Sequence, residues 1–187
     1  MFRTILIIAL TVFANLVQAL DAASFYQIDL IVFTHQQASI AKELSLKSTL
    51  TAGKITPIPL LTEASKNLTP YHLLPSSSSQ LREEYWALHR KPQFQVLLHY
   101  TWLQPLNSQS AISIPKIEHK GFELEGTLRI QRSNYYLLDS ELLIATPDSN
   151  QTPFVFTQKQ RLKGGSIYYL DHPLAGMLIK IHQLGTA

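Results

Sequence analysis

The fold is decided by the stretch Phe122-Glu123-Leu124-Glu125-Gly126-Thr127-Leu128-Arg129-Ile130-Gln131. Its even-numbered positions are apolar or glycine, and its odd-numbered positions are charged or polar. This two-residue alternation predicts a β-strand with one dry face and one solvated face. The short polar segment Arg132-Ser133-Asn134 follows, so residues 122–131 and 135–144 are expected to pair as an antiparallel hairpin.

Strands are also predicted on both sides of this hairpin. Residues 25–33 place four apolar side chains on one face, while Gln27 and Asp29 begin the other face. The pair Gly164-Gly165 is expected to form a tight turn. The remaining predicted strands are 94–102, 154–163, 166–171 and, as a strand or a short apolar tail, 177–182.

Two helices are expected before most of these strands. A helical rhythm of apolar residues runs through 38–50, and a second helix, opened by a serine, is expected at about 79–90. Between them, residues 51–80 are rich in Pro, Ser and Thr and are expected to form an irregular connection. The pattern predicts a single α+β domain, a largely antiparallel β-meander with about two helices on one face.

The N-terminus has the pattern of a secretory signal peptide over residues 1–19. Arg3 supplies the positive charge, an apolar run follows, and Val17-Gln18-Ala19 places small side chains at the cleavage positions. An uncleaved N-terminal anchor is the alternative. The chain has no cysteine, which excludes a lipobox and favours a protein of the bacterial envelope. The expected location is therefore the periplasm, with residues 20–187 as one domain that has no membrane span.

The charge of this domain argues against nucleic acid as a partner. Removal of residues 1–19 leaves 15 basic against 13 acidic residues, a net charge of +2. Nothing in the sequence indicates a face with clustered Lys and Arg, the footprint of nucleic-acid binding. A weak basic excess is compatible with an anionic polymer or a membrane surface.

The sequence has no pattern for catalysis, a metal or a cofactor. There is neither a His-Glu-x-x-His motif nor a Gly-x-Ser-x-Gly elbow. Glu123 and Glu125 share a strand face, as a glycosidase pair could. Arg129 lies on the same face, however, so a solvated charged strand explains the two acids more simply.

The segment Tyr169-Leu170-Asp171-His172-Pro173-Leu174-Ala175-Gly176 admits a catalytic and a structural interpretation. Proline biases the preceding residue toward an extended conformation, and an aspartate can cap the amides that follow it. Adjacent side chains on an extended chain diverge, which disfavours a catalytic Asp-His pair. We therefore expect a structural corner between the last strands, formed by Asp171, His172, Pro173 and Gly176.

Four segments, in this order and after a signal peptide, together resemble one protein family. The segments are 26–33, 94–105, 125–130 with 136–139, and 161–176. They resemble the CsiV family of gammaproteobacterial periplasmic proteins, and Tyr-x-Asp-His-Pro-x-x-Gly is the most specific part. The resemblance implies a non-catalytic peptidoglycan-binding protein that supports cell-wall synthesis. It also implies a partner, the outer-membrane lipoprotein activator of a class A penicillin-binding protein.

The chain departs from the family pattern just before its last motif. Only Arg161 and Lys163 remain of a denser basic run, and Ile167 and Tyr168 stand where an acid and a histidine are usual. If either feature contacts the wall or a partner, binding is expected to be weaker in this protein.

Ligand contacts are expected from Trp86, Arg161 and Lys163. An exposed ring can stack on a sugar, and basic groups can meet the carboxylates of stem peptides. Two alternatives stay open. One is a protein-interaction adaptor that binds no glycan; the other is a wall hydrolase that uses Asp171, His172 or Glu125.

Overall fold

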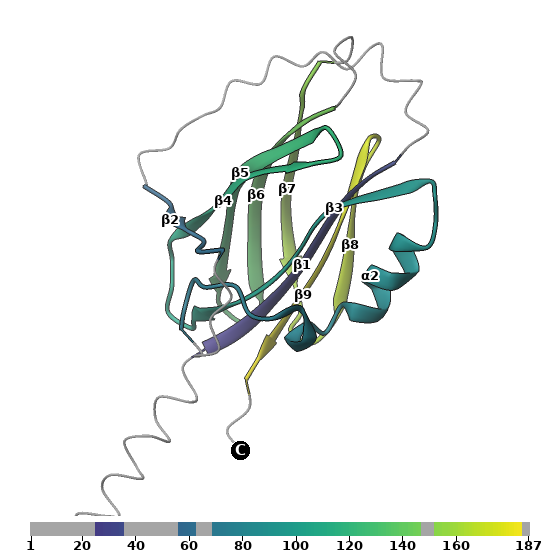
Figure 1. Ribbon diagram of the computed structural model, residues 1–187. Helices are drawn as coiled ribbons and strands as arrows, with labels where there is room; N and C mark the ends of the chain where they lie inside the picture. Colours follow the sequence, from purple (N-terminus) through teal and green to yellow (C-terminus); the bar gives the residue numbers. More distant parts are fainter. Residues whose placement is uncertain (1–24, 36–55, 63–68, 147–151, 185–187) are drawn as a thin grey trace, which may run out of the picture.

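A computed structural model describes residues 25–35, 56–62, 69–146 and 152–184 of the chain. These residues form nine β-strands in two sheets, one α-helix and one short 3-10 helix (Figure 1). The elements are β1 (Phe25–His35), β2 (Ile58–Pro59), η2 (Ser76–Ser78), α2 (Arg82–His89), β3 (Phe94–Pro105), β4 (Ala111–His119), β5 (Phe122–Arg132), β6 (Tyr136–Ala145), β7 (Phe154–Leu162), β8 (Ile167–His172) and β9 (Ala175–Gln183).

The four-stranded sheet has the order β3-β1-β9-β8, and every neighbouring pair in it is antiparallel. β1 is an inner strand, so Ile28 pairs with Trp102 of β3 on one side and with Ile181 of β9 on the other. The first described strand of the chain therefore pairs directly with the last one.

The five-stranded sheet has the order β2-β4-β5-β6-β7. The strands from β4 to β7 are antiparallel neighbours, and the two-residue β2 runs parallel to β4. The pairing of β5 with β6 runs from Glu123 opposite Ala145 to Arg132 opposite Tyr136. This register confirms the hairpin predicted from the alternating sequence.

The main hydrophobic core lies between the two sheets (Figure 1). Tyr26 of β1 connects them, because its hydroxyl donates to the Ile130 carbonyl at 3.2 Å and its ring lies 5.4 Å from that of Tyr136. Full burial of an aliphatic or aromatic side chain contributes about 1.5–3 kcal/mol, so the apolar faces of the alternating strands hold the two layers together. The facing residues of β5 and β6 are Leu124, Leu128, Ile130, Leu138, Leu142 and Ile144.

The segment from η2 to α2 covers part of the outer face of the four-stranded sheet. Leu81, just before α2, is fully buried in a second cluster with Ile31 and Phe33 of β1, and Tyr85 packs against this cluster. Both faces of β1 are consequently covered, which explains why nine of its 11 residues are buried.

The prediction of an α+β fold with two helices on one face is wrong. The described residues are mostly β-strand, lie in two sheets and contain one α-helix, α2, inside the predicted range 79–90. The helix expected at 38–50 lies outside the described residues. The strand β4 was not predicted, because Pro115 interrupts its pattern where the pairing with β5 shifts register. The strands predicted at 25–33, 94–102, 154–163, 166–171 and 177–182 are confirmed.

Parts of the predicted irregular connection at 51–80 follow the edges of both sheets. Leu60 donates its backbone N–H to Ser113 of β4 at 3.0 Å, and Leu74 donates to the Thr101 carbonyl of β3 at 2.8 Å. These backbone bonds connect the two sheets on the side of β3 and β4. The predicted signal peptide at 1–19 lies outside the described residues.

Candidate functional site

Charged side chains lie in rows across the outer face of the five-stranded sheet. Arg129 of β5, Asp139 of β6 and Lys159 of β7 are cross-strand neighbours. Arg129 donates to Asp139 Oδ2 at 2.8 Å, and Lys159 Nζ lies 3.9 Å from the same oxygen. Odd-numbered residues of these strands point outward because their even-numbered neighbours face the core.

The adjacent row adds Arg161, whose guanidinium lies over the ring of Tyr135, 4.8 Å from its centroid. An arginine on an aromatic face is held in place by the ring quadrupole. The two rows border a shallow, open groove of about 300 Å³. Its lining residues are Arg129, Gln131, Leu137, Leu138, Asp139, Lys159, Gln160 and Arg161.

The groove has an excess of positive charge, because three basic side chains and a single carboxylate line it. Arg129 shares its charge with Asp139, whereas Lys159 is 74% exposed and only loosely paired. A guanidinium fork binds a carboxylate in two parallel hydrogen bonds, which gives both strength and orientation. The groove is thus suited to an anionic group of a ligand.

The structure does not bring the three predicted contact residues together. Arg161 lines the groove. Lys163 follows the end of β7, where its backbone N–H donates to the Tyr168 hydroxyl at 2.8 Å. Trp86 lies on α2, 52% exposed, with its ring 5.1 Å from that of Tyr85. The tryptophan therefore belongs to the layer outside the other sheet.

Asp171, His172, Pro173 and Gly176 lie at the turn between β8 and β9, where His172 pairs with Ala175. The His172 ring points inward and stacks on Phe154 at 4.9 Å and 7°. Its Nδ1 accepts the backbone N–H of Leu174 at 3.1 Å. Burial lowers the pKa of His172, an effect that the nearby Asp171 opposes. The ring stack and the Leu174 N–H hold this imidazole in place in the turn, and burial favours its neutral form.

The Asp171 side chain points to the opposite, outer face of β8. It accepts a hydrogen bond from the Tyr169 hydroxyl, and its Oδ1 lies 3.8 Å from Nε2 of His35. Burial, followed by the hydrogen bond to Asp171, raises the pKa of Tyr169 to about 12. Asp171 and His172 therefore face away from each other, as adjacent residues of a strand do.

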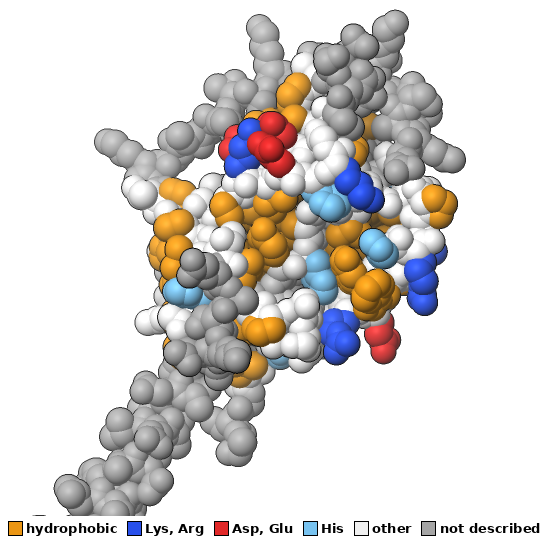
Figure 2. All heavy atoms as spheres, in the orientation of Figure 1, with side chains coloured by type: hydrophobic (Ala, Val, Ile, Leu, Met, Phe, Trp, Pro, Cys, Tyr) orange, Lys and Arg blue, Asp and Glu red, His pale blue; other side chains and the backbone are white. Residues whose placement is uncertain are grey.

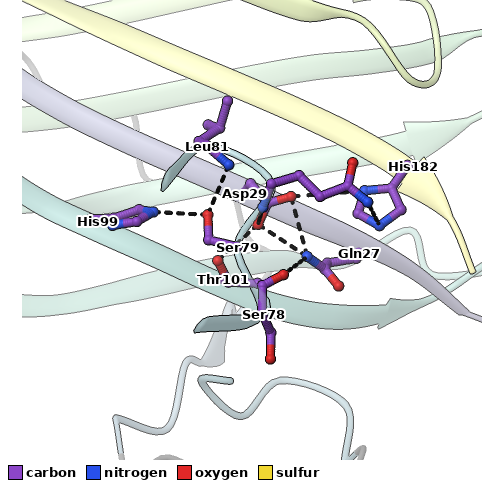
Figure 3. A network of polar contacts seen from close by, with 9 residues as sticks. Gln27, Asp29, Ser78, Ser79, Leu81, His99, Thr101 and His182 are labelled. Atoms are coloured by element: carbon purple, nitrogen blue, oxygen red, sulfur yellow. Dashed lines mark hydrogen bonds and ion pairs between the residues drawn. The ribbon is translucent and has the colours of Figure 1, made fainter. Parts of the chain in front are cut away.

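A second polar arrangement surrounds Asp29, which is fully buried on β1 (Figure 3). Its carboxylate accepts hydrogen bonds from Gln27 Nε2 at 3.1 and 3.2 Å, from Thr101 Oγ1 at 2.8 Å and from the Gln80 backbone N–H at 3.3 Å. Gln27 Nε2 also donates to the Ser78 carbonyl at 2.9 Å. The buried acid thus anchors the segment that leads into α2.

Two histidines border this arrangement without forming a catalytic relay. Ser79 Oγ lies 2.8 Å from His99 Nε2, whereas Asp29 Oδ2 lies 3.8 Å from Nδ1 of a different histidine, His182. A Ser-His-Asp relay needs one imidazole between the serine and the acid. Burial lowers the pKa of both histidines, and Asp29 opposes this effect in each case. The arrangement is suited to holding a segment in place.

One face of the described part of the chain is largely apolar at its centre. On the side shown in Figure 2, hydrophobic and histidine side chains occupy the centre and charged side chains lie toward the margin. In the part of the chain that the structure describes, there is no group of three or more His, Asp or Glu side chains placed to hold a metal ion. No described helix is long and apolar enough to cross a membrane.

Sequence reasoning did not single out Arg129, Lys159 or Asp139 as site residues, although a signal was present. The predicted hairpin places Arg129 near Asp139 on the solvated face, and the register of β6 with β7 adds Lys159. The sequence does not predict which residues of β6 and β7 pair, because a connection as long as 146–153 does not fix the register. Asp29 was placed on the second face of its strand, but nothing indicated what buries it.

These features describe a mostly β, two-sheet protein with a cationic groove on one outer face. The family model "Peptidoglycan-binding protein, CsiV" matches residues 5–184, nearly the whole chain. The chain therefore belongs to the CsiV family, a family of peptidoglycan-binding proteins, and the resemblance drawn from its four segments is confirmed. No curated protein and no solved structure matches the chain.

Proposed function

We propose that this protein binds peptidoglycan in the periplasm without catalysing a reaction, and that its cationic groove holds carboxylates of the stem peptides. The observation that carries this proposal is the grouping of Arg129, Lys159 and Arg161 around one open groove. Stem peptides present free carboxylates at regular intervals along the polymer. Charge-assisted hydrogen bonds from arginine and lysine are the strongest contacts that such groups can make.

The groove is prepared for such a ligand in two ways. The ring of Tyr135 restrains Arg161, so less conformational freedom is lost when a carboxylate binds. Lys159 is mostly exposed and can turn from Asp139 toward an incoming anion, because an exposed ion pair is worth only about 0–1 kcal/mol. Many weak contacts of this kind, repeated along a polymer, give useful avidity.

The absence of catalysis is supported by the positions of the acids that could act on the wall. Asp171 and His172 lie on opposite faces of β8. Glu123 lies 3.0 Å from Lys116 Nζ, next to the exposed Glu118, in a solvated charge cluster on β4 and β5. Incubation with muropeptides, followed by mass spectrometry, should yield no new product; turnover that is lost in His172→Ala would contradict this part of the proposal.

The binding itself is tested by sedimentation with insoluble sacculi. At low salt the wild-type protein should pellet with the sacculi. The double variant Lys159→Gln/Arg161→Gln should bind at least about fivefold more weakly, since two of the three cations of the groove are lost. Arg82→Gln on the exposed start of α2 is the matched control and should bind like wild type. A wild-type protein that stays in the supernatant would refute the proposed function.

The proposed role in the envelope is support of cell-wall synthesis together with the lipoprotein activator of a class A penicillin-binding protein. The resemblance of the four segments supports this role, and residues 1–19 supply the proposed export signal. Crosslinking in intact cells tests the partnership: the activator should be captured by wild type. Capture of the activator by a protein that binds no sacculi would favour an adaptor. Trp86 and Lys163 remain proposed contacts outside the groove.

A further inference from the structure

The outer face of β8 presents an exposed aromatic ring that is held in a fixed position. Tyr169 is 52% exposed, although its ring is stacked on Phe33 with centroids 6.2 Å apart and planes at 14°. Its hydroxyl is bound to Asp171. Single exposed hydrophobic side chains are common on protein surfaces, but this ring is held by two neighbours. A ring that is both exposed and restrained is suited to receive another flat, apolar surface.

Gly176 makes this arrangement possible. A Cβ at this position would stand 2.9 Å from Tyr169 Cε2 and would also collide with Cζ of Phe33. Both rings therefore lie directly on the backbone of β9, in space that any other residue would fill. The tyrosine and the glycine of Tyr-x-Asp-His-Pro-x-x-Gly are thus two parts of one aromatic platform.

Polar groups lie along the rim of this platform. The Asp171 side chain is 69% exposed, and an ionised carboxylate has more acceptor sites than one tyrosine hydroxyl uses. His35 lies beside it, with Nε2 3.8 Å from Asp171 Oδ1 and with its ring 5.6 Å from that of Phe33. An imidazole can both donate and accept hydrogen bonds. The rim therefore offers an acceptor and a donor within a few ångströms of an apolar surface.

A pyranose ring has the complementary chemistry. Its C–H groups form an apolar face, while its hydroxyl and acetamido groups project from the edge and need hydrogen-bond partners. Stacking on a tyrosine covers the apolar face, and the Asp171 carboxylate and the His35 imidazole can meet the edge groups. Because the platform is already ordered by Phe33, binding loses little side-chain entropy.

A partner strand fits this place less well. β8 is an edge strand of its sheet, and an open edge could accept one. However, the Asp171 carbonyl already accepts Gln158 Nε2 of β7 at 3.1 Å, and the Tyr168 hydroxyl accepts the Lys163 N–H at 2.8 Å. The neighbouring strand of the other sheet therefore covers part of this edge.

We propose that Tyr169, Asp171 and His35 form a saccharide site that stacks one N-acetylated pyranose of a glycan strand on the Tyr169 ring. This inference rests on the proposed function and deepens it, because it assigns the sugar to a place separate from the groove for stem-peptide carboxylates. The Gln158–Asp171 bond places β7 beside β8, so the two sites flank the same seam between the sheets.

Titration with chitotetraose, a β-1,4-linked tetramer of N-acetylglucosamine, tests the saccharide site by NMR. The tetramer has no carboxylate, so the groove should contribute nothing. Tyr169→Ala should bind at least about tenfold more weakly than wild type, while Tyr169→Phe should keep most of the affinity because the ring remains. Leu61→Ala, which truncates another exposed apolar side chain (46%), is the matched control and should bind like wild type.

A second variant guards against a loss that merely reflects unfolding. Asp171→Asn alters an exposed rim group and should weaken tetramer binding about threefold or more, with an unchanged unfolding transition. If wild type pellets with sacculi but binds no tetramer, or if Tyr169→Ala binds it like wild type, the saccharide site is refuted and the proposed function stands. If wild type does not pellet with sacculi, the proposed function itself fails.

Discussion

Thr101 Oγ1 donates a 2.8 Å hydrogen bond to Asp29 Oδ1, and the two residues are also cross-strand partners of β3 and β1. The side-chain bond therefore reinforces the backbone register in a place where no water reaches the carboxylate. A buried charge is tolerated only when hydrogen bonds replace its hydration. Gln27 Nε2 and the Gln80 backbone N–H donate the other hydrogen bonds to this carboxylate.

Asp29→Ala should destabilise the protein strongly, by about 2–5 kcal/mol, because it leaves the donors of Gln27, Thr101 and Gln80 buried without their acceptor. Thr101→Val removes a single donor and should cost about 1–2 kcal/mol. Urea unfolding followed by far-UV circular dichroism measures both. Neutral surface substitutions change the free energy of unfolding by roughly 0.5 kcal/mol or less. A change of that size in Asp29→Ala would show that the carboxylate does not anchor this segment.

Gly176→Ala should destabilise the protein by about 1–3 kcal/mol, because the new Cβ meets the rings of Phe33 and Tyr169. The effect is steric, so a smaller side chain in place of Phe33, which packs on the glycine, should reduce the destabilisation. In a double-mutant cycle, Phe33→Leu should make Gly176→Ala less harmful than it is alone. Strictly additive effects on the unfolding free energy would contradict the close approach of ring and backbone.

Mild acid should destabilise the fold through its buried histidines. Burial lowers the pKa of His99, His172 and His182 from the ordinary value of 6.5. The unfolded chain then takes up protons at a higher pH than the folded chain, so this contribution to stability is complete above about pH 6.5 and is lost as pH falls below it. The urea midpoint should consequently be lower at pH 5.5 than at pH 7.5.

His182→Gln isolates one of these groups. Desolvation is the largest effect on the pKa of this imidazole; the Asp29 carboxylate favours its charged form, and Lys180 opposes that form. The variant removes the group that titrates, so its urea midpoint should change less than that of wild type between the two pH values. A urea midpoint that depends more steeply on pH in the variant than in wild type would show that folding does not lower the pKa of His182.

The strands were predictable wherever one face is dry and the other wet, as in 122–131. The arrangement of the sheets was not, because β1 pairs with β3 and β9 across most of the chain, and nothing local records such partners. β1 also has no solvated face, since the segment before α2 covers Asp29 and Ile31. Polar residues on the second face of a strand give the same sequence pattern whether they face water or form a buried hydrogen-bond network.

In the candidate sites, too, some residues were predictable from the sequence and others depend on how the strands pair. Arg161 was predicted as a contact because it is one of two basic residues before the last motif; it lines the groove, and its contact with a ligand stays a prediction. Its neighbour Lys159 lies two residues earlier on the same strand, whereas Arg129 comes from β5, and only the sheet register brings that arginine to the groove. Tyr169 and Gly176 belong to one motif, but Phe33, whose ring also packs on Gly176, lies more than 130 residues earlier.

Asp139→Asn should strengthen binding to sacculi, because Asp139 is the single carboxylate that lines the cationic groove and competes with the ligand for Arg129. Its side chain is 34% exposed, so water screens the pair and the gain should be modest, about two- to fivefold at low salt. The gain should shrink as salt is raised, because the added attraction is electrostatic. Sedimentation at about 20 and about 300 mM salt measures this salt dependence. The Debye length is roughly twice 10 Å at the lower concentration and roughly half of 10 Å at the higher one. Glu118→Gln, which removes a 72% exposed acid outside both proposed sites, is the matched control and should not strengthen binding. Weaker binding by Asp139→Asn would mean that the ligand needs Arg129 to be held by its acid, and that the groove does not act as a simple anion site.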